Sequence, residues 1–286
     1  MSDISTGGFT KGFAEVPYPA FDGGLPLLNT FYFRFDIPTD PDPVDNHLNS
    51  IMVLPGGASE DLSPSAENNP SNVSDGRLQV MLRDAEPTSA KDEYFYKIGH
   101  NVLRGAMSGR RYQVRDIGLG PFGTIRRELP ASIFPDGAVA ALCGFKLFYT
   151  GNRDHHVDVF QVEFIEDGKT LELGLNDANN DDVFGYLVDF IVLTPSPLNS
   201  IQTGTSQGHA RITDQVELPP GPSHANWGIR GFLFNSKAHT PADRHIREFG
   251  ILNKDRNLRV FHGDDIGSAS FDWKVDWIDV APPVFA

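Results

Sequence analysis

The sequence has almost no cysteine and no long apolar run. Its single cysteine, Cys143, excludes an internal disulfide and therefore a fold held together by disulfides. No stretch approaches 18 apolar residues, which excludes a membrane-spanning helix. Residues 1–8 have neither a basic head nor an apolar stretch, so a Sec signal is not expected. We therefore predict synthesis in the cytoplasm, with a protein that is released or becomes part of a particle.

Basic residues are also in short supply. The chain has 24 Lys and Arg against 38 Asp and Glu, a formal net charge of −14. Nucleic acid is excluded as a partner, because no basic surplus is left to neutralise phosphates. Docking to an anionic membrane is disfavoured for the same reason. The charge favours one of two roles: keeping the protein soluble, or helping it bind cations or basic partners.

Catalytic signatures are missing as well. The sequence has no Gly-x-Ser-x-Gly elbow, no phosphate-binding loop, no His-Glu-x-x-His and no dinucleotide fingerprint. Cys143 lies in an apolar segment, which is a poor setting for a thiolate nucleophile. We predict that the protein is not an enzyme. A hydrolase acting on glycans stays open as an alternative, because 38 acidic residues allow many carboxylate pairs.

The sequence is rich in segments that alternate with period two. In 158–164 and 274–280, apolar and polar residues trade places, as on strands with one face in water. The 21 prolines and 28 glycines punctuate these segments as turns. A hydrophobic content of 40% with 21 phenylalanines is enough to fill a core. The pattern predicts an all-β, antiparallel fold.

An Asp-x-His-apolar tetrad occurs three times, each time among similar neighbours. A Glu-apolar-Pro step and an aromatic alternation precede it, and an apolar ladder that ends on Asp follows it. The spacing from Glu to His is 32, 28 and 28 residues in the three copies. Such a period predicts three tandem degenerate antiparallel β-sandwich repeats, arranged around a pseudo-threefold axis or in a row. The tetrads are Asp45-Asn46-His47-Leu48, Asp154-His155-His156-Val157 and Asp243-Arg244-His245-Ile246.

The repeats predict three units along the chain. The first spans 1–105 and carries an inserted loop at 56–75 that is rich in Ser, Pro, Asn and Gly. The second spans 119–195 and the third 207–286. The segments 104–118 and 194–206 are predicted linkers.

The tetrads supply the first candidate site. On a strand, residues i and i+2 share a face, so the Asp and His of each tetrad would point the same way. One interpretation is a ligand or metal site repeated three times, with imidazoles suited to zinc. The other is a set of hydrogen bonds that fix the entry to a strand. The residues are Asp45, His47, Asp154, His156, Asp243 and His245.

Acidic turns supply the second candidate site. Their carboxylate and amide oxygens are the ligands that calcium prefers, although the spacing is not that of an EF-hand. Asp and Asn are also ordinary residues of hairpin turns, so a purely structural role is the alternative. The candidates are Asp177, Asn179, Asp181 and Asp182 in the second unit, and Asp264 and Asp265 in the third.

The closing segment Phe271–Val280, with Val275-Asp276-Trp277-Ile278-Asp279, is similar to the last strand of the H-type lectin domain. The resemblance extends loosely over each repeat, although the first two lack the tryptophan. It implies a small antiparallel sandwich that assembles as a trimer and binds sugars of the N-acetylgalactosamine type. A chain with three such units would mimic that trimer. None of the family's sugar-contacting residues can be matched to a position of this chain.

Two functions follow from these patterns. The first is a structural component of a larger particle or fibre, resembling a part of a phage tail or an injection apparatus. Its partners would be other protein subunits, and the chain would be an oligomer. The second is a soluble carbohydrate-binding lectin with divalent-metal sites for calcium or zinc. Internal repeats and the lack of a signal favour the first, whereas the lectin resemblance and the acidic turns favour the second.

Overall fold

The computed structural model is built almost wholly of strands. It describes residues 2–35, 48–63, 73–84, 93–104, 108–117, 124–150, 157–166, 168–177, 183–195, 200–218, 227–236, 246–254, 257–264 and 270–281. The only helical element within these ranges is one 3-10 turn, η1 (Ala131–Ile133). No helix of the described chain is long and apolar enough to cross a membrane. The all-β class that the alternation predicts is confirmed.

The strands, in chain order, are β1 (Ser2–Lys11), β2 (Phe13–Pro17), β3 (Leu25–Phe35), β4 (Leu48–Pro55), β5 (Glu60–Asp61), β6 (Arg77–Asp84), β7 (Glu93–Leu103), β8 (Ser108–Ile117), β9 (Thr124–Glu128), β10 (Val139–Tyr149), β11 (Val157–Ile165), β12 (Thr170–Asp177), β13 (Phe184–Thr194), β14 (Ile201–Glu217), β15 (Trp227–Asn235), β16 (Ile246–Lys254), β17 (Asn257–Asp264) and β18 (Ser270–Val280).

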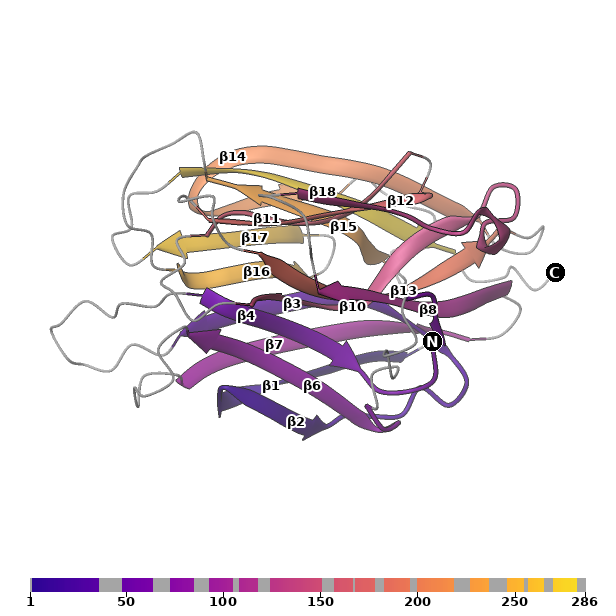
Figure 1. Ribbon diagram of the computed structural model, residues 1–286, viewed down its shortest axis with the longest axis horizontal. Coiled ribbons are helices and arrows are strands. Elements are labelled where there is room, and N and C mark those ends of the chain that lie inside the picture. Colours follow the sequence, from indigo (N-terminus) through magenta and orange to yellow (C-terminus); the bar gives the residue numbers. More distant parts are fainter. Residues whose placement is uncertain are drawn as a thin grey trace, which may run out of the picture.

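These strands form two sheets (Figure 1). The larger has the order β1-β7-β3-β16-β17-β14-β18-β15-β11-β12-β9, and the smaller has the order β2-β6-β4-β10-β13-β8-β5. Among the described strands every pairing is antiparallel except that of β5 with β8. The long strand β14 joins two parts of the larger sheet, because residues 201–211 pair with β18 and residues 212–217 pair with β17.

Strands of the three predicted units are interleaved. β3 of the first unit pairs with β16 of the third, β10 of the second pairs with β4 of the first, and β15 of the third pairs with β11 of the second. Each unit therefore depends on another to complete its sheet. The sequence predicts separate sandwiches in tandem, whereas the structure shares strands between the three segments.

The three central strands carry a β-bulge at matching points. The register shifts around Asn29 in β3, around Cys143 in β10 and around Arg230 in β15. A bulge adds one residue to one strand and so changes which side chains face inward beyond it. Two residues past each bulge stands a phenylalanine whose side chain is fully buried.

These three side chains, which we name the central phenylalanines, are Phe31, Phe145 and Phe232. Their ring centroids lie 5.1 Å (Phe31–Phe145), 4.9 Å (Phe31–Phe232) and 5.2 Å (Phe145–Phe232) apart. Each ring thus contacts the other two, and β3, β10 and β15 pack against one another around them. Aromatic pairs of this kind contribute about 0.5–1.5 kcal/mol beyond the area they bury. The core of the molecule therefore lies where the three segments meet.

Both linker predictions are wrong. Segment 104–118 contains strand β8, in which Tyr112 and Val114 are buried against the core. Segment 194–206 contains the start of β14, which pairs with β18 from Ile201 onward. Charged or small residues hide the alternation in both places. The arginines around Tyr112 and the Gly, Thr and Gln residues of β14 look like loop in the sequence.

Candidate functional site

The six Asp-x-His candidates lie outside the described residues. Asp45, His47, Asp154, His156, Asp243 and His245 all fall in the gaps between described ranges. The apolar residue that follows each His is described and is the first residue of a strand. Leu48, Val157 and Ile246 begin β4, β11 and β16, with exposed fractions of 2%, 0% and 3%. The tetrads therefore stand immediately before three core strands, and their zinc-binding role stays a prediction.

The acidic-turn candidates are placed only in part. Asp177 ends β12 opposite Val157, and Asp264 ends β17 opposite Ile246. Asn179, Asp181, Asp182 and Asp265 lie outside the described residues. Within the described ranges no three His, Cys, Asp or Glu side chains come close enough to hold a metal ion. Calcium binding at these turns also stays a prediction.

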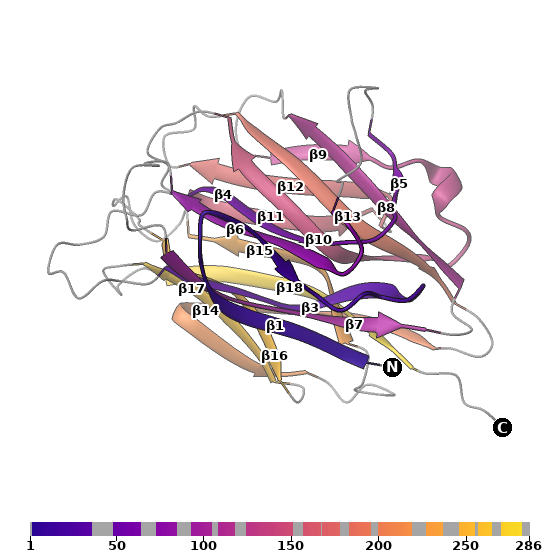
Figure 2. The ribbon, with the colours of Figure 1, turned by 90° about the horizontal axis from the view of Figure 1, so that it is seen from below.

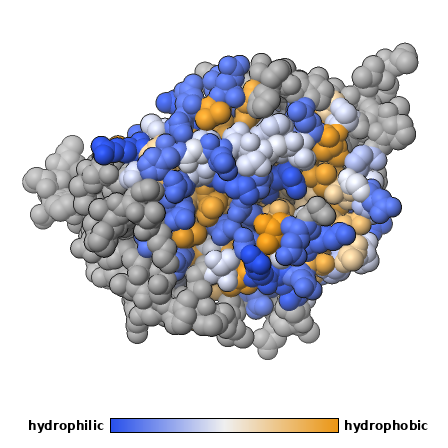
Figure 3. All heavy atoms as spheres, turned by 90° about the horizontal axis from the view of Figure 1, so that it is seen from above, coloured by the Kyte–Doolittle hydropathy of each residue, from blue (hydrophilic) through white to orange (hydrophobic). Residues whose placement is uncertain are grey.

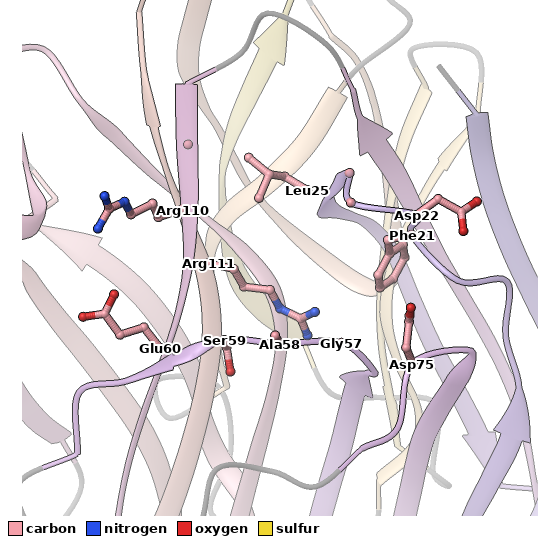
Figure 4. A pocket seen from close by; sticks show the side chains of 13 residues that line it. Phe21, Asp22, Leu25, Gly57, Ala58, Ser59, Glu60, Asp75, Arg110 and Arg111 are labelled. Atoms are coloured by element: carbon pink, nitrogen blue, oxygen red, sulfur yellow. The ribbon is translucent and has the colours of Figure 1, made fainter.

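The structure has a cavity of about 490 Å³ that the sequence did not indicate (Figure 4). Its walls come from the segment between β2 and β3 with the start of β3, the segment from the end of β4 to the start of β5, the turn before β6 and the start of β8. The lining mixes glycines, acidic residues, two arginines and one aromatic ring: Phe21, Asp22, Gly23, Gly24, Leu25, Gly57, Ala58, Ser59, Glu60, Asp75, Gly109, Arg110 and Arg111.

Arg111, which lines this cavity, belongs to a buried ion pair. The Arg111 guanidinium donates to both carboxylate oxygens of Asp189 on the neighbouring strand, with Nε 2.9 Å from Oδ1. Nη1 donates to the Gly56 carbonyl and Nη2 to the Pro55 carbonyl, each at 2.7 Å. Only 6% of the Arg111 side chain and none of the Asp189 side chain is exposed. Two-pronged pairing of this kind is what makes buried charge tolerable.

The two partners have shifted pKa values. Burial raises the pKa of the Asp189 carboxyl above its ordinary value, and Arg111 opposes that rise. Burial also acts to lower the pKa of Arg111, but the Asp189 carboxylate outweighs it and the pKa is raised. A guanidinium does not deprotonate in proteins, so Arg111 stays charged, and its hydrogen bonds to Asp189, Gly56 and Pro55 tie β8 and β13 to the end of β4.

Glycine at position 57 leaves room for the Arg111 guanidinium at the cavity wall. Gly57 has φ +103, a backbone conformation that residues with a side chain rarely adopt. A Cβ there would lie 2.9 Å from Nη1 of Arg111. The same point lies 3.9 Å from Oδ1 of Asp75 and 4.0 Å from the Phe21 ring. Figure 4 shows Arg111 pointing toward this group, whereas Glu60 points away from it.

A second polar group is buried nearby, between β7 and β10. His100 is fully buried, with Nε2 2.7 Å from the Cys143 carbonyl oxygen and Nδ1 2.7 Å from the Tyr18 hydroxyl. A carbonyl can only accept, so Nε2 carries a proton. The one proton of the Tyr18 hydroxyl is shared between two acceptors, Nδ1 of His100 and the Ile4 carbonyl oxygen 3.0 Å away. Burial lowers the pKa of His100 to about 4, against the opposing hydrogen bond to Cys143. The imidazole is therefore neutral at pH 7.

Cys143 is inert in this setting. It is fully buried, and Sγ donates to the Pro26 carbonyl at 2.9 Å. Burial raises the pKa of its thiol well above the ordinary value, which suppresses the thiolate. Of the described groups with a shifted pKa, Arg111 alone lines the cavity. The arrangement suits binding by fixed donors and acceptors more than it suits proton transfer.

Sequence reasoning missed both buried polar groups, although one signal was present. Asp189 stands within the apolar run from Tyr186 to Leu193, and an acidic residue there indicates a buried partner. The partner, Arg111, is 78 residues away and lies in a segment predicted to be a linker. His100 likewise needs Tyr18, which is 82 residues away. Pairs so distant in the chain are visible only in the fold.

Comparisons with known proteins give little guidance. No family model matches the chain, and no curated protein matches it. Among solved structures it is similar to the infectious bursal disease virus VP2 subviral particle, with 9% identity, a TM-score of 0.14, and coverage of 99% of this chain and 80% of that one. The structure of Sulfolobus turreted icosahedral virus has 9% identity and a TM-score of 0.12, with coverage of 99% of this chain and 92% of that one. An archaeal virus protein with a triple jelly roll fold and turret assembly has 9% identity and a TM-score of 0.12, with coverage of 98% of this chain and 91% of that one. Scores this low identify neither a family nor a function.

Proposed function

We propose that the chain is a non-catalytic assembly protein, a subunit of a larger particle or fibre, built as a single-chain version of a threefold arrangement. Its three segments then correspond to the three subunits of a ring, fused head to tail. The proposal keeps the predicted repeats but replaces tandem packing with interleaved packing. Two features of the described strands support it.

The first feature is a set of pairings that occurs three times. The opening strand of each segment pairs with the closing strand: β1 with β7, β8 with β13, and β14 with β18. The closing strand pairs with the central strand: β7 with β3, β13 with β10, and β18 with β15. Each central strand then pairs with a strand of another segment. Bulges at the same points of the three central strands fit the same scheme.

The second feature, which carries the proposal, is that the outward faces of these matching strands have different chemistry. The residue after each central phenylalanine lies on an outer face, and so does its neighbour on the closing strand. A symmetric binding protein would repeat one set of side chains there. The paired residues are instead Tyr32 and Lys97, Lys146 and Leu187, and Leu233 and Lys274.

The outer faces of the three segments also differ in the side chains around these pairs. Tyr32, Phe95 and Phe261 form an aromatic row on the first. Buried apolar side chains, among them Met52 and Met81, cluster on the second. The third carries a charged network, in which Lys274 lies 2.7 Å from Glu163 and Arg126 lies 2.7 Å from Glu172. Figure 3, which looks onto the side of β14 and β18, shows mainly hydrophilic side chains with apolar patches between them. Three unlike faces suit a subunit that meets different neighbours on different sides.

Light scattering over a wide range of protein concentration tests this proposal. An assembly subunit is expected to give a mass above that of one chain, increasing with concentration. A monomer at every concentration, with no larger species in electron micrographs, would contradict it.

A second candidate function is glycan binding, which the cavity beside Arg111 favours. It offers a guanidinium donor, the Asp75 carboxylate and the Phe21 ring around one point, in a concave site lined by glycines. A glycan array with the wild-type protein and Asp75→Asn tests it. Loss of a wild-type signal in the variant supports a lectin, and no signal with the wild type rejects it. Glu60→Gln is the matched control, because Glu60 also lines the cavity but points away from Arg111.

A further inference from the structure

We infer that two copies of this chain join through the corner between β1 and β2, with Phe9 and Phe13 in the contact. The inference rests on the proposed assembly function and names the surface that serves it. We call this surface, made by β1, Gly12 and β2, the first corner. Figures 1 and 2 show β1 at the margin of the molecule, beside β7.

Exposed aromatic rings gather at the first corner. Among the described residues, the large hydrophobic side chains that are exposed are Phe9 (61%), Phe13 (56%) and Val183 (36%). Phe9 and Phe13 stand on either side of Gly12, where the chain passes from one sheet to the other. Phe9 rests edge-on against Phe95, with ring centroids 5.3 Å apart. A solvent-exposed apolar patch bordered by polar residues is typical of an interaction surface.

The fold does not require these rings. The bend within β14 matches the first corner, since Ile212 has φ 62 where Gly12 has φ 50. In β14 the position corresponding to Phe9 is His209, and the position corresponding to Phe13 is Thr213. Both of those residues are exposed. The same backbone bend therefore forms with polar side chains at these two positions, so the two phenylalanines serve something other than folding.

Among the strands that the structure describes, β1 has a partner on one side only. It pairs along its length with β7 and forms one end of the larger sheet. Its middle, residues 5–9, has no charge and no proline, the two devices that usually protect an edge. The edge of β8, the matching strand, is extended by β5, so a strand of this type accepts another beside it. The other sheet ends are short and carry charge or proline, as β9 and β2 do.

The charges around the corner favour a second copy as the occupant. With a net charge of −14 per chain, two copies repel each other unless they meet at a locally neutral surface. At the first corner two cations lie beside anions: Lys11 lies 3.7 Å from Glu93, and Arg77 lies 3.9 Å from Glu15. A strongly acidic or basic partner would find no charge to match there. A twofold axis sets two identical edges antiparallel, which is how β1 already pairs with β7.

The test compares the wild type with the double variant Phe9→His and Phe13→Thr, whose new residues are those of the matching bend in β14. Light scattering measures self-association, and thermal unfolding checks the fold. We expect the wild type to associate and the double variant to associate at least tenfold more weakly, with an unchanged melting temperature. Val183→Thr is the matched control, because it removes the other exposed apolar side chain, and it should associate as the wild type does.

The outcomes separate this inference from the function on which it rests. A wild type that never associates overturns both. A wild type and a double variant that associate equally overturn the corner contact and leave the assembly function standing.

A second measurement covers the case in which the double variant fails to fold. A spin label on Ser5→Cys, an exposed position of β1, reports the distance between copies. Cys143 stays unlabelled because it is fully buried. The label on Ser5→Cys should give a short distance between copies, and a label on Arg126→Cys in β9 should not. A long or absent distance from Ser5→Cys overturns the contact.

Discussion

At the scale of single residues, the molecule holds polar groups inside its core by giving each a specific partner. His100 has the Tyr18 hydroxyl and the Cys143 carbonyl, and Asp189 has Arg111. The sequence predicts that Asp189 needs a partner, because it interrupts an apolar run. It does not predict which one, since any of 24 basic residues satisfies the same requirement until the fold brings one near.

His100 should make the protein sensitive to acid. Its pKa is about 4 when folded and 6.5 ordinarily. Above pH 6.5 the imidazole is neutral in both states, and as the pH falls toward 4 the unfolded chain binds the proton first. The free energy of unfolding should therefore decrease by about 3 kcal/mol between these limits and level off below them. Denaturant titrations at a series of pH values measure this, and His100→Phe, with the residue of the matching position Phe190, should lack this contribution. An identical acid response in the variant would contradict the assignment.

Removing one partner of the buried ion pair should be far more harmful than removing both. Arg111→Met leaves the Asp189 carboxylate buried and uncompensated, at a cost of about 3–5 kcal/mol. Arg111→Met with Asp189→Leu removes both charges and should recover most of that loss. A double-mutant cycle by chemical unfolding measures the coupling. Additive losses would show that the two side chains do not stabilise each other.

At the scale of strands, alternation predicts strands well where one face is buried and poorly where it is not. β11 and β18 alternate clearly and were predicted. Among the described strands, β8 is paired along its length only with β13, and the start of β14 is paired only with β18. Both have few apolar residues, so the sequence predicts linkers there. The alignment of the Glu-apolar-Pro motif in the first unit is also wrong by the strand register. Glu128 pairs with Thr170, and Glu217 pairs with Asn257, each at the first residue of the neighbouring strand. In the first unit that place, opposite Arg77, is taken by Pro17. Glu15-Val16-Pro17 is thus aligned two residues too early. Register is weakly specified where a strand buries little.

The bend in β14 offers a test at this scale. Ile212 has φ 62, a left-handed conformation that is strained for a β-branched residue, and the matching bend uses Gly12. Ile212→Gly should therefore stabilise the protein by about 1 kcal/mol, since relief of strain outweighs the loss of a half-buried side chain. Thermal unfolding measures the change. Thr213→Gly, at a position without positive φ, should destabilise and is the control. A loss of stability in Ile212→Gly equal to that of the control would show that the bend is not strained.

At the scale of the whole molecule, the three segments are held together by strands of one segment pairing with strands of another. The sequence predicts three similar segments, and all three contribute a central phenylalanine. It does not predict that each segment finishes its sheet with a strand of another, because pairing between segments depends on packing at the centre and leaves no local pattern. The candidate sites were less predictable still. The cavity and its ion pair are assembled from the first two segments, by residues far apart in the chain.

The pairing of strands between segments predicts that the whole chain unfolds cooperatively. Three independent sandwiches would unfold in up to three transitions, whereas segments that complete one another's sheets should unfold together. Calorimetry should give one transition whose calorimetric and van't Hoff enthalpies agree. Phe145→Ala, which opens a space at the centre, should destabilise by about 3–5 kcal/mol and move the whole transition to lower temperature. Because the central phenylalanines touch one another, a change in the second segment reaches the first and third directly. A variant in which one part melts early while the rest stays unchanged would mean that the segments are independent units.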